Sequence, residues 1–339
     1  MRAVVVPCHG GPEVLELREV PDPRPAPADV LVAVEAIGVN YHDALARSGA
    51  LAAEPPFIAG VEAAGTVLET GTEVTDLVPG QRIVWPFTEG SYAELAAIPA
   101  RWGVPVPDEV SSEQAAALVA QGLTAHYLSF DTYAVRPGDD VLVHAAAGGV
   151  GRLLVQLATH RGGRVIATTS SDAKADFVRD AGAAEVVGYE NLPAKIRELT
   201  GGKGVEVVYD GVGAATFEAS LAAVARRGHL VCYGATSGPV PPFEIRRLSR
   251  AGSPYLSRPS LIDYVVSRAD LLARADQVFE LAARGVIQVP VTGRFGLDEA
   301  QTAQQLLDDR TRVGKLIIFP QGVPQTATET ATALAAEAR

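Results

Sequence analysis

A cluster of small residues between two apolar runs is the feature that most constrains the fold of this chain. The segment VLVHAAAGGVGRLLVQLA, residues 141–158, runs from an apolar stretch across three glycines into a helical pattern. Val150, Leu153, Leu154 and Leu157 recur at the spacing of one helix face. Glycine permits a sharp turn and a close approach of the backbone to a ligand. The pattern predicts a strand, a tight turn and a helix N-terminus that favours a phosphate, and a turn that serves packing alone is the alternative.

The glycine cluster lies within a regular alternation of strand and helix patterns. The expected strands are 141–144, 164–168, 205–209 and 229–233, and the expected helices are 151–161, 172–181 and 215–225, after a helix that begins near residue 113. This alternation favours a parallel sheet with helices on both faces. The context raises the glycine cluster from a weak signal to a nucleotide-binding hypothesis.

The first third of the chain has a different pattern. Residues 30–37, 65–69 and 82–85 read as short strands joined by Pro- and Gly-rich segments, which is typical of a β-rich domain. Residues 21–29 form a stiff, proline-rich connector, and the apolar segment 315–319 is a strand near the end of the chain. We assign no function to the low-complexity segment that follows.

Composition excludes several classes of function. The 339 residues are 47% hydrophobic, which is enough for two ordinary domains. The formal charge of −11 and the lack of a basic run argue against nucleic acid as a main partner. The sequence has no apolar stretch of the roughly 18–20 residues that span a bilayer and no signal-peptide layout, so we expect a cytoplasmic protein. Cys8 and Cys232 cannot supply a four-thiolate zinc site, and we expect both on apolar strands.

The end of the second strand of the alternating region bears on the choice of nucleotide. NAD-binding units place an acidic residue there to hold the ribose 2′-hydroxyl. Here the neutral residues Thr169, Ser170 and Ser171 stand at that place, and Lys174 follows. These residues suit a 2′-phosphate and predict NADP(H). Asp172 is the contrary observation, and we interpret it as the N-cap of the next helix.

Five segments resemble one known family when they are taken together. They are QGLTAHYL (121–128), HAAAGGVG (144–151), YDGVG (209–213), YGATSG (233–238) and SRPSL (257–261). In combination they resemble the zinc-independent, zeta-crystallin-like quinone oxidoreductases of the medium-chain dehydrogenase/reductase superfamily. The resemblance extends up to about Pro320.

The resemblance implies an α/β architecture made of two domains. A GroES-like, β-rich substrate domain is expected from 1–122 and 262–320, with a Rossmann-type NADPH-binding domain, 123–261, inserted between them and a tail at 321–339. It further implies that NADPH lies in the cleft between the domains. Homodimers joined through the sheet edge of the nucleotide domain are also expected.

The resemblance also implies the roles of individual residues. Lys174, Tyr189 and Arg310 match positions around the 2′-phosphate, and Asn40 and Thr124 match positions near the nicotinamide. The full expected cofactor set is Gly148, Gly149, Val150, Gly151, Ser170, Lys174, Tyr189, Gly213, Tyr233, Gly234, Thr236, Ser257 and Arg310. The expected catalytic set is Asn40, Tyr41, Asp43 and Thr124.

No metal site is expected. Zinc alcohol dehydrogenases of the superfamily have a Cys where GVNYHD has Asn40, and a His where GVEAAG has Val61. Hydride transfer to a quinone needs neither zinc nor a strong acid, because the cofactor carries the chemistry. Asn40 either donates a hydrogen bond to the reduced oxygen or anchors the ribose, and Asp43 either orients Asn40 or caps the following helix, which we favour. Tyr41 or Tyr127 is a possible proton source.

The expected substrate pocket departs from the family pattern. Leu45 replaces a tyrosine, Leu51 replaces a second aromatic residue, and Tyr127 completes the set, so the pocket is expected to be more aliphatic. NADPH-dependent quinone reduction is the first hypothesis. Reduction of α,β-unsaturated ketones or enoyl thioesters is the second. The third is a catalytically silent NADPH-binding protein.

Overall fold

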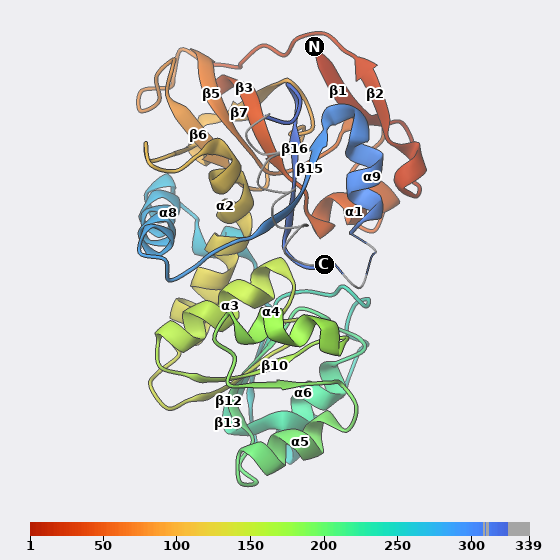
Figure 1. Ribbon diagram of the computed structural model, residues 1–339, viewed down its shortest axis with the longest axis vertical. Coiled ribbons are helices and arrows are strands. Elements are labelled where there is room, and N and C mark those ends of the chain that lie inside the picture. The colour runs from red at the N-terminus through yellow and green to blue at the C-terminus, as the bar shows by residue number, and fades with distance from the viewer. Residues whose placement is uncertain (308, 310–311, 325–339) are drawn as a thin grey trace, which may run out of the picture. The chain divides into compact units, whose positions relative to one another are not determined.

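The computed structural model describes residues 1–307, 309 and 312–324, which fall into two compact units (Figure 1). Unit 1 comprises residues 1–120 and the described residues from Val289 onward, and unit 2 comprises Gln121–Gln288. The first boundary falls inside helix α2 (Ser112–Tyr127). Expected domain boundaries at 122 and 262 differ from this division, because residues 262–288 pack within unit 2. Two contacts explain the difference: Tyr264 stacks on Tyr127 at 4.3 Å, and Arg274 hydrogen-bonds His126 at 2.9 Å.

Unit 1 contains two β-sheets. One has the strand order β2-β1-β4, and the other has the order β15-β16-β3-β5-β6-β8, with β7 also paired to β3. The strands are β1 (Arg2–Val6), β2 (Glu16–Glu19), β3 (Asp29–Gly38), β4 (Phe57–Ile58), β5 (Ala63–Thr70), β6 (Arg82–Trp85), β7 (Leu95–Pro99), β8 (Val104–Pro105), β15 (Val291–Gly296) and β16 (Lys315–Phe319). The helices are α1 (Tyr41–Ser48), the first part of α2, α9 (Ala300–Gln305) and the short turns η1 (Pro12–Val14), η2 (Ala100–Trp102) and η6 (Leu297–Glu299). The antiparallel pairing of β16 with β3 joins the end of the chain to its beginning.

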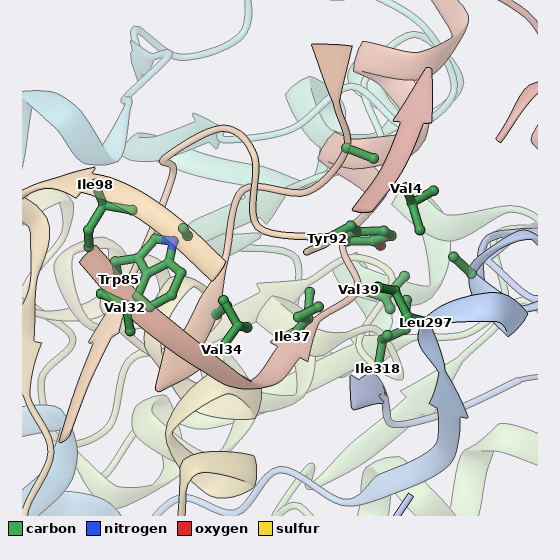
Figure 2. Close-up of a cluster of buried hydrophobic side chains, with 14 of the residues drawn as sticks. Val4, Val32, Val34, Ile37, Val39, Trp85, Tyr92, Ile98, Leu297 and Ile318 are labelled. Atoms are coloured by element: carbon green, nitrogen blue, oxygen red, sulfur yellow. The ribbon is translucent and has the colours of Figure 1, made fainter. Parts of the chain in front are cut away.

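The core of unit 1 is built from the inward faces of these strands. Figure 2 shows the cluster, in which alternate residues of β3 meet side chains from β6, β7 and β16. Its labelled members are Val4, Val32, Val34, Ile37, Val39, Trp85, Tyr92, Ile98, Leu297 and Ile318. Val30, Val32 and Val34 follow the period of two along β3, and a register shift between Val34 and Ala36 brings Ile37 to the same face. Trp85 is fully buried, and its indole N–H donates to Ser91 Oγ at 3.0 Å.

Unit 2 is a doubly wound parallel sheet. Its strand order is β11-β10-β9-β12-β13-β14, and every described pairing in this sheet is parallel. The strands are β9 (Asp140–Val143), β10 (Arg164–Thr168), β11 (Glu185–Val187), β12 (Val205–Asp210), β13 (Val224–Cys232) and β14 (Tyr255–Ser257). The helices are the rest of α2, η3 (Leu128–Thr132), α3 (Gly149–His160), η4 (Asp172–Lys174), α4 (Ala175–Arg179), α5 (Leu192–Leu199), α6 (Phe217–Ala223), α7 (Arg246–Arg250), η5 (Leu261–Tyr264) and α8 (Arg268–Ala283). Figure 1 shows α3 and α4 on one face of the sheet and α5 and α6 on the other.

Most predicted elements are confirmed, and a few boundaries are wrong. Strands β6, β10 and β16 have the predicted bounds, whereas the helix expected at 172–181 is divided into η4 and the five-residue α4. Ser171, not Asp172, stands at the N-cap of η4. Cys8 lies beyond β1 and is exposed, which contradicts its expected place on a strand, whereas Cys232 ends β13 and is buried. Within the described part of the chain, no helix is long and apolar enough to cross a membrane.

Candidate nucleotide site and candidate catalytic site

The expected cofactor residues of unit 2 gather at one edge of its sheet. Because the strands are parallel, their carboxyl ends lie along the same edge, which is where open α/β sheets bind nucleotides. The glycine turn follows β9, Ser170 follows β10, Gly213 follows β12, Tyr233 and Gly234 follow β13, and Ser257 ends β14. The order of the strands therefore brings together residues that are more than a hundred positions apart in the sequence.

The glycine turn is held so closely that side chains are excluded from it. Gly148 is the N-cap of α3 in an extended conformation, and its N–H donates to the carbonyl of Ala145 at 2.9 Å. A Cβ added to Gly149 would lie 2.2 Å from the amide oxygen of Gln121, and one added to Gly151 would lie 2.4 Å from the carbonyl of Ala145. The N–H groups of the first turn of α3, which includes Val150, have no partner within the helix. A compact anion such as a pyrophosphate fits this cradle.

The segment after β10 carries the residues expected at the 2′-phosphate. Ser170 is exposed, and Lys174 is half-buried at the end of η4. The three residues after Thr168 are neutral, which suits the 2′-phosphate of NADP(H). Tyr189 follows β11, and its hydroxyl accepts the N–H of Ala145 at 3.1 Å. Arg310 lies outside the described residues.

The loops after β12 and β13 pack tightly against each other. Gly213 has a φ of +91°, and a Cβ added there would lie 2.6 Å from the carbonyl of Gly238. A Cβ added to Gly234 would lie 2.5 Å from the carbonyl of Gly211. Thr236 is exposed at the end of this loop pair. Glycine is therefore required at these positions for packing.

The end of α2 contributes two further predicted residues to unit 2. Thr124 is half-buried, one helical turn after Gln121, which fills the space beside Gly149. Tyr127 is only 2% exposed and stacks on Tyr264. Burial raises the pKa of the Tyr127 hydroxyl. This environment favours a packing role for Tyr127 over that of a proton donor.

In unit 1, Asn40 is held by a buried ion pair. It stands between β3 and α1, where its Nδ2 donates to Glu62 Oε2 at 2.7 Å and to the carbonyl of Gly38 at 3.1 Å. Lys315 Nζ donates to Asn40 Oδ1 at 2.8 Å and to Glu62 Oε2 at 2.7 Å. The other carboxylate oxygen of Glu62 accepts the N–H of Ala120 at 2.7 Å. Because ammonium groups only donate and carboxylates only accept, the orientation of the Asn40 amide is fixed, and both of its protons are engaged.

Asp43 caps helix α1, as predicted. Its Oδ2 accepts the N–H of Asn40 at 2.9 Å and the hydroxyl of Tyr92 at 2.9 Å. The carboxyl is 3% exposed, and its second oxygen, Oδ1, has no hydrogen-bond partner within the described residues. Burial raises the pKa of Asp43 to about 7.

The remaining predicted residues of unit 1 lie on α1 and just beyond it. Tyr41 is 37% exposed at the start of the helix. Leu45 and Leu51 are half-buried, and the N–H of Leu51 donates to the carbonyl of Leu45 at 3.2 Å, which folds the chain back on the helix end. One turn of the backbone thus holds these two residues close in space.

Sequence reasoning missed the polar groups that support these residues. In unit 1 these groups are Glu62, Lys315 and Tyr92. The one signal was a lysine that opens an apolar strand, since a charge in such a place requires a buried partner. In unit 2 they include His144 and Asp210, both fully buried. They lie inside quoted motifs, yet their partners come from other elements.

The residues at the superfamily's zinc position do not fit a zinc ion. Asn40 and Val61 stand where the zinc enzymes have ligands, and the carboxylate of Glu62 is paired with Lys315. An aliphatic side chain and an amide whose donor faces a carboxylate cannot replace a thiolate and an imidazole. Across residues 1–307, 309 and 312–324, no group of three His, Cys, Asp or Glu side chains is arranged to hold a metal.

Together, the mainly antiparallel unit and the doubly wound unit define a medium-chain dehydrogenase/reductase. Two family models match the chain: the alcohol dehydrogenase GroES-like domain at residues 26–108 and the zinc-binding dehydrogenase domain at 149–258. The chain is 41% identical to a quinone oxidoreductase of Salmonella typhimurium over 92% of this chain and 97% of that protein. It is 36% identical to a 2-haloacrylate reductase of Burkholderia sp, over 94% and 99%.

A solved structure gives the same result. The quinone oxidoreductase of Escherichia coli, complexed with NADPH, is 38% identical and superposes with a TM-score of 0.92 over 94% of this chain and all of that one. The chain belongs to the quinone oxidoreductase family of the medium-chain dehydrogenases/reductases. The resemblance drawn from the five sequence segments is confirmed.

Proposed function

We propose that this protein uses NADPH to reduce a quinone by hydride transfer without a metal ion. The observation that carries the proposal is the glycine turn at the N-terminus of α3, at the carboxyl edge of a sheet in dinucleotide-binding order. Membership of the quinone oxidoreductase family and the NADPH in the Escherichia coli structure support it. NADPH supplies the hydride when it is bound. The protein binds the cofactor and the acceptor, orients them and excludes water.

The cofactor side is assigned to unit 2. The backbone of Gly149 and Val150 binds the pyrophosphate, while Ser170, Lys174 and Tyr189 surround the 2′-phosphate. Arg310 remains a predicted contributor. The neutral residues after β10 support NADPH over NADH, because a carboxylate there would repel the phosphate. Thr124, Tyr233, Gly234, Thr236 and Ser257 are proposed to contact the nicotinamide end of the cofactor.

The substrate side is assigned to unit 1. Both amide protons of Asn40 are engaged by Gly38 and Glu62, which favours anchoring of the cofactor ribose over donation to the reduced oxygen. Tyr41, exposed at the start of α1, is the proposed proton source, and Asp43 maintains the local backbone. Leu45 and Leu51 give the pocket an aliphatic wall.

Reduction of an activated alkene is a second candidate function. The similarity to a 2-haloacrylate reductase favours it, as does the aliphatic pair Leu45 and Leu51, which offers no hydroxyl donors. Both reactions use the same cofactor site. They differ in the acceptor, which an assay can distinguish directly.

Oxidation of NADPH, followed by absorbance, tests the proposal. An ortho-quinone, a para-naphthoquinone and a simple enone are compared, each with chelator, with NADH in place of NADPH, and without enzyme. We expect turnover of quinones with NADPH that chelator does not affect. Preference for the enone would transfer the assignment to alkene reduction. A thermal shift with NADPH but no turnover of any acceptor would instead indicate a silent binding protein.

A homodimer is proposed from the edge of the unit 2 sheet. Strand β14 ends the sheet order, and Tyr255 on it is 56% exposed, with Ile262 (58%) and Val266 (79%) nearby in sequence. An edge strand flanked by exposed apolar residues is suited to pairing with a second copy. Sedimentation of the wild type and of Tyr255→Asp would test the homodimer, with a monomeric wild type as the contradicting result.

A cytoplasmic location also remains proposed, to be tested by cell fractionation.

A further inference from the structure

A chain of buried polar side chains runs beneath the proposed nucleotide site of unit 2. It connects residues from neighbouring strand ends: Asp210 on β12, His144 after β9, Thr168 on β10 and Tyr189 after β11, with Ser220 of α6 between Asp210 and His144. His144, Thr168, Ser220 and Asp210 are each 0% exposed. Neither the proposed hydride transfer nor the five sequence motifs account for this chain.

The anchor of the chain is the carboxylate of Asp210. Its oxygens accept the N–H groups of Val212 and Gly213 at 2.9 and 3.0 Å and the hydroxyls of Thr216 and Ser220 at 2.8 and 2.7 Å. Hydrogen bonds to an ionised acceptor are stronger than those between neutral groups. The single proton of Ser220 therefore points to Asp210.

The Asp210 carboxylate determines which groups donate and which accept in the rest of the chain. The Ser220 hydroxyl donates its only proton to Asp210, so its oxygen accepts from His144 Nε2, 2.9 Å away. Burial lowers the pKa of His144 and favours the neutral ring, in which Nδ1 accepts from Thr168 Oγ1 at 3.1 Å. The ring of His144, held at both nitrogens, stacks in turn on the ring of Tyr189.

Two contacts hold Tyr189 next to this chain. Its hydroxyl accepts the N–H of Ala145, the residue after His144, at 3.1 Å. The ring also stacks on His144, with centroids 5.8 Å apart and planes 11° apart. Tyr189 is thus held at its hydroxyl by the Ala145 turn and at its ring face by His144.

We propose that the chain Asp210–Ser220–His144–Thr168 positions Tyr189 and the Ala145 turn at the 2′-phosphate side of the cofactor site. The chain thereby contributes to the preference for NADPH over NADH. This inference rests on the proposed function, because it needs NADPH in that site. His144, Thr168 and Ser220 are positioning residues, since the structure gives them no path to the ligand except through Tyr189 and the turn.

The test measures dissociation constants of NADPH and NADH by titration calorimetry, without any acceptor, so that it does not depend on turnover. Thr168→Val removes one hydroxyl with little change of shape. It is expected to lower the NADPH-over-NADH preference about fivefold, which corresponds to one neutral hydrogen bond. Tyr189→Phe, which removes the acceptor of the Ala145 N–H, should also lower the preference. The double variant should be no worse than Tyr189→Phe, because Thr168 acts on the cofactor site only through Tyr189 and the Ala145 turn.

Thr200→Val is the matched control. Thr200 is also buried in unit 2, where its hydroxyl donates to the carbonyl of Ile196 at 2.7 Å, far along the sequence from the strand ends. This variant should lose stability and keep the wild-type preference. Ser220→Ala provides a second break in the chain if Thr168→Val folds poorly, and it too should lower the preference.

Two results would overturn the inference. One is an unchanged preference in Thr168→Val and Ser220→Ala while Tyr189→Phe loses it, since Tyr189 would then act independently of the chain. The other is an equal loss in Thr200→Val, which would make the effect a general one of stability. A wild type that binds NADPH no better than NADH would instead overturn the proposed NADPH preference, and the positioning role with it.

Discussion

Asp43 and Asp210 are both buried aspartates, but the two units satisfy their carboxylates in different ways. Asp210 accepts from two backbone N–H groups and two hydroxyls. Asp43 accepts from one N–H group and one hydroxyl, and its Oδ1 has no partner within the described residues. Burial of a charge is tolerated only when donors replace the lost water. The carboxylate of Asp210 is therefore satisfied by four donors, whereas the less satisfied carboxyl of Asp43 has its pKa raised by burial to about 7.

The surroundings of the two aspartates reinforce this difference. Asp43 lies in the unit that also buries Lys315 and Glu62, which are 2% and 0% exposed and joined at 2.7 Å. In unit 2, Asp210 needs no ammonium group, because backbone N–H groups and hydroxyls surround it. The comparison teaches that a buried carboxylate can be stabilised by a counter-charge or by preorganised dipoles. We expect mutations in these two kinds of site to change the free energy of unfolding by different amounts.

Replacement of Lys315 by Met is expected to have the largest effect. It leaves the Glu62 carboxylate buried without its counter-charge, which costs about 3–5 kcal/mol in the free energy of unfolding. Urea denaturation measures the loss. The exposed Lys203→Met is the control and should stay within about 0.5 kcal/mol of the wild type. Equal effects of the two variants would show that the ion pair does not stabilise unit 1.

Asp43 should make stability fall as pH rises. Its pKa in the folded state is about 7 against an ordinary 3.8, so the folded state binds this proton more tightly than the unfolded state does. The free energy of unfolding then decreases with pH between about 4 and 7 and is flat above that range. Relative to Asp43→Asn, the wild type should lose roughly 2–3 kcal/mol between about pH 5 and about pH 8.

Denaturation of both proteins at several pH values supplies that difference curve. The exposed Asp108→Asn serves as the matched variant and should follow the wild type at every pH. A difference between wild type and Asp43→Asn that stays constant with pH would mean that Asp43 titrates normally.

Asp210→Asn tests the carboxylate that is stabilised by N–H groups and hydroxyls, and it should have the smallest of these effects. The amide NH₂ would face a hydroxyl or N–H donor, which costs about 1–3 kcal/mol in the free energy of unfolding. Denaturation at a single pH is sufficient, with Asp43→Asn measured beside it as the contrasting variant. At about pH 8, Asp43→Asn should not be destabilising, because it removes a poorly solvated charge. If Asp210→Asn is also harmless, the backbone donors do not make the proposed difference between the two sites.

Many features of unit 2 can be predicted from residues that are close together in the sequence. The glycine turn of 148–151, the helix face after it and the strand of 164–168 are signals carried by adjacent residues, and they predicted the parallel sheet. The cap formed by Asp43 is equally local, because it spans three residues. Such features are predictable because the groups that interact are neighbours along the chain.

The tertiary structure decided which polar groups meet. The Glu62–Lys315 pair joins residues that are 253 positions apart, and the His144–Ser220 bond joins residues that are 76 apart. No sequence pattern specifies these partners, since they depend on strand order and register. The sequence by itself determined the class of fold and the place of the nucleotide turn. Only the packed structure determined that residues 262–288 belong to unit 2, that Asn40 contacts an ion pair, and that Tyr189 stacks on a histidine held by buried hydrogen bonds. The physical reason is that buried polar groups are satisfied by partners that folding alone brings together.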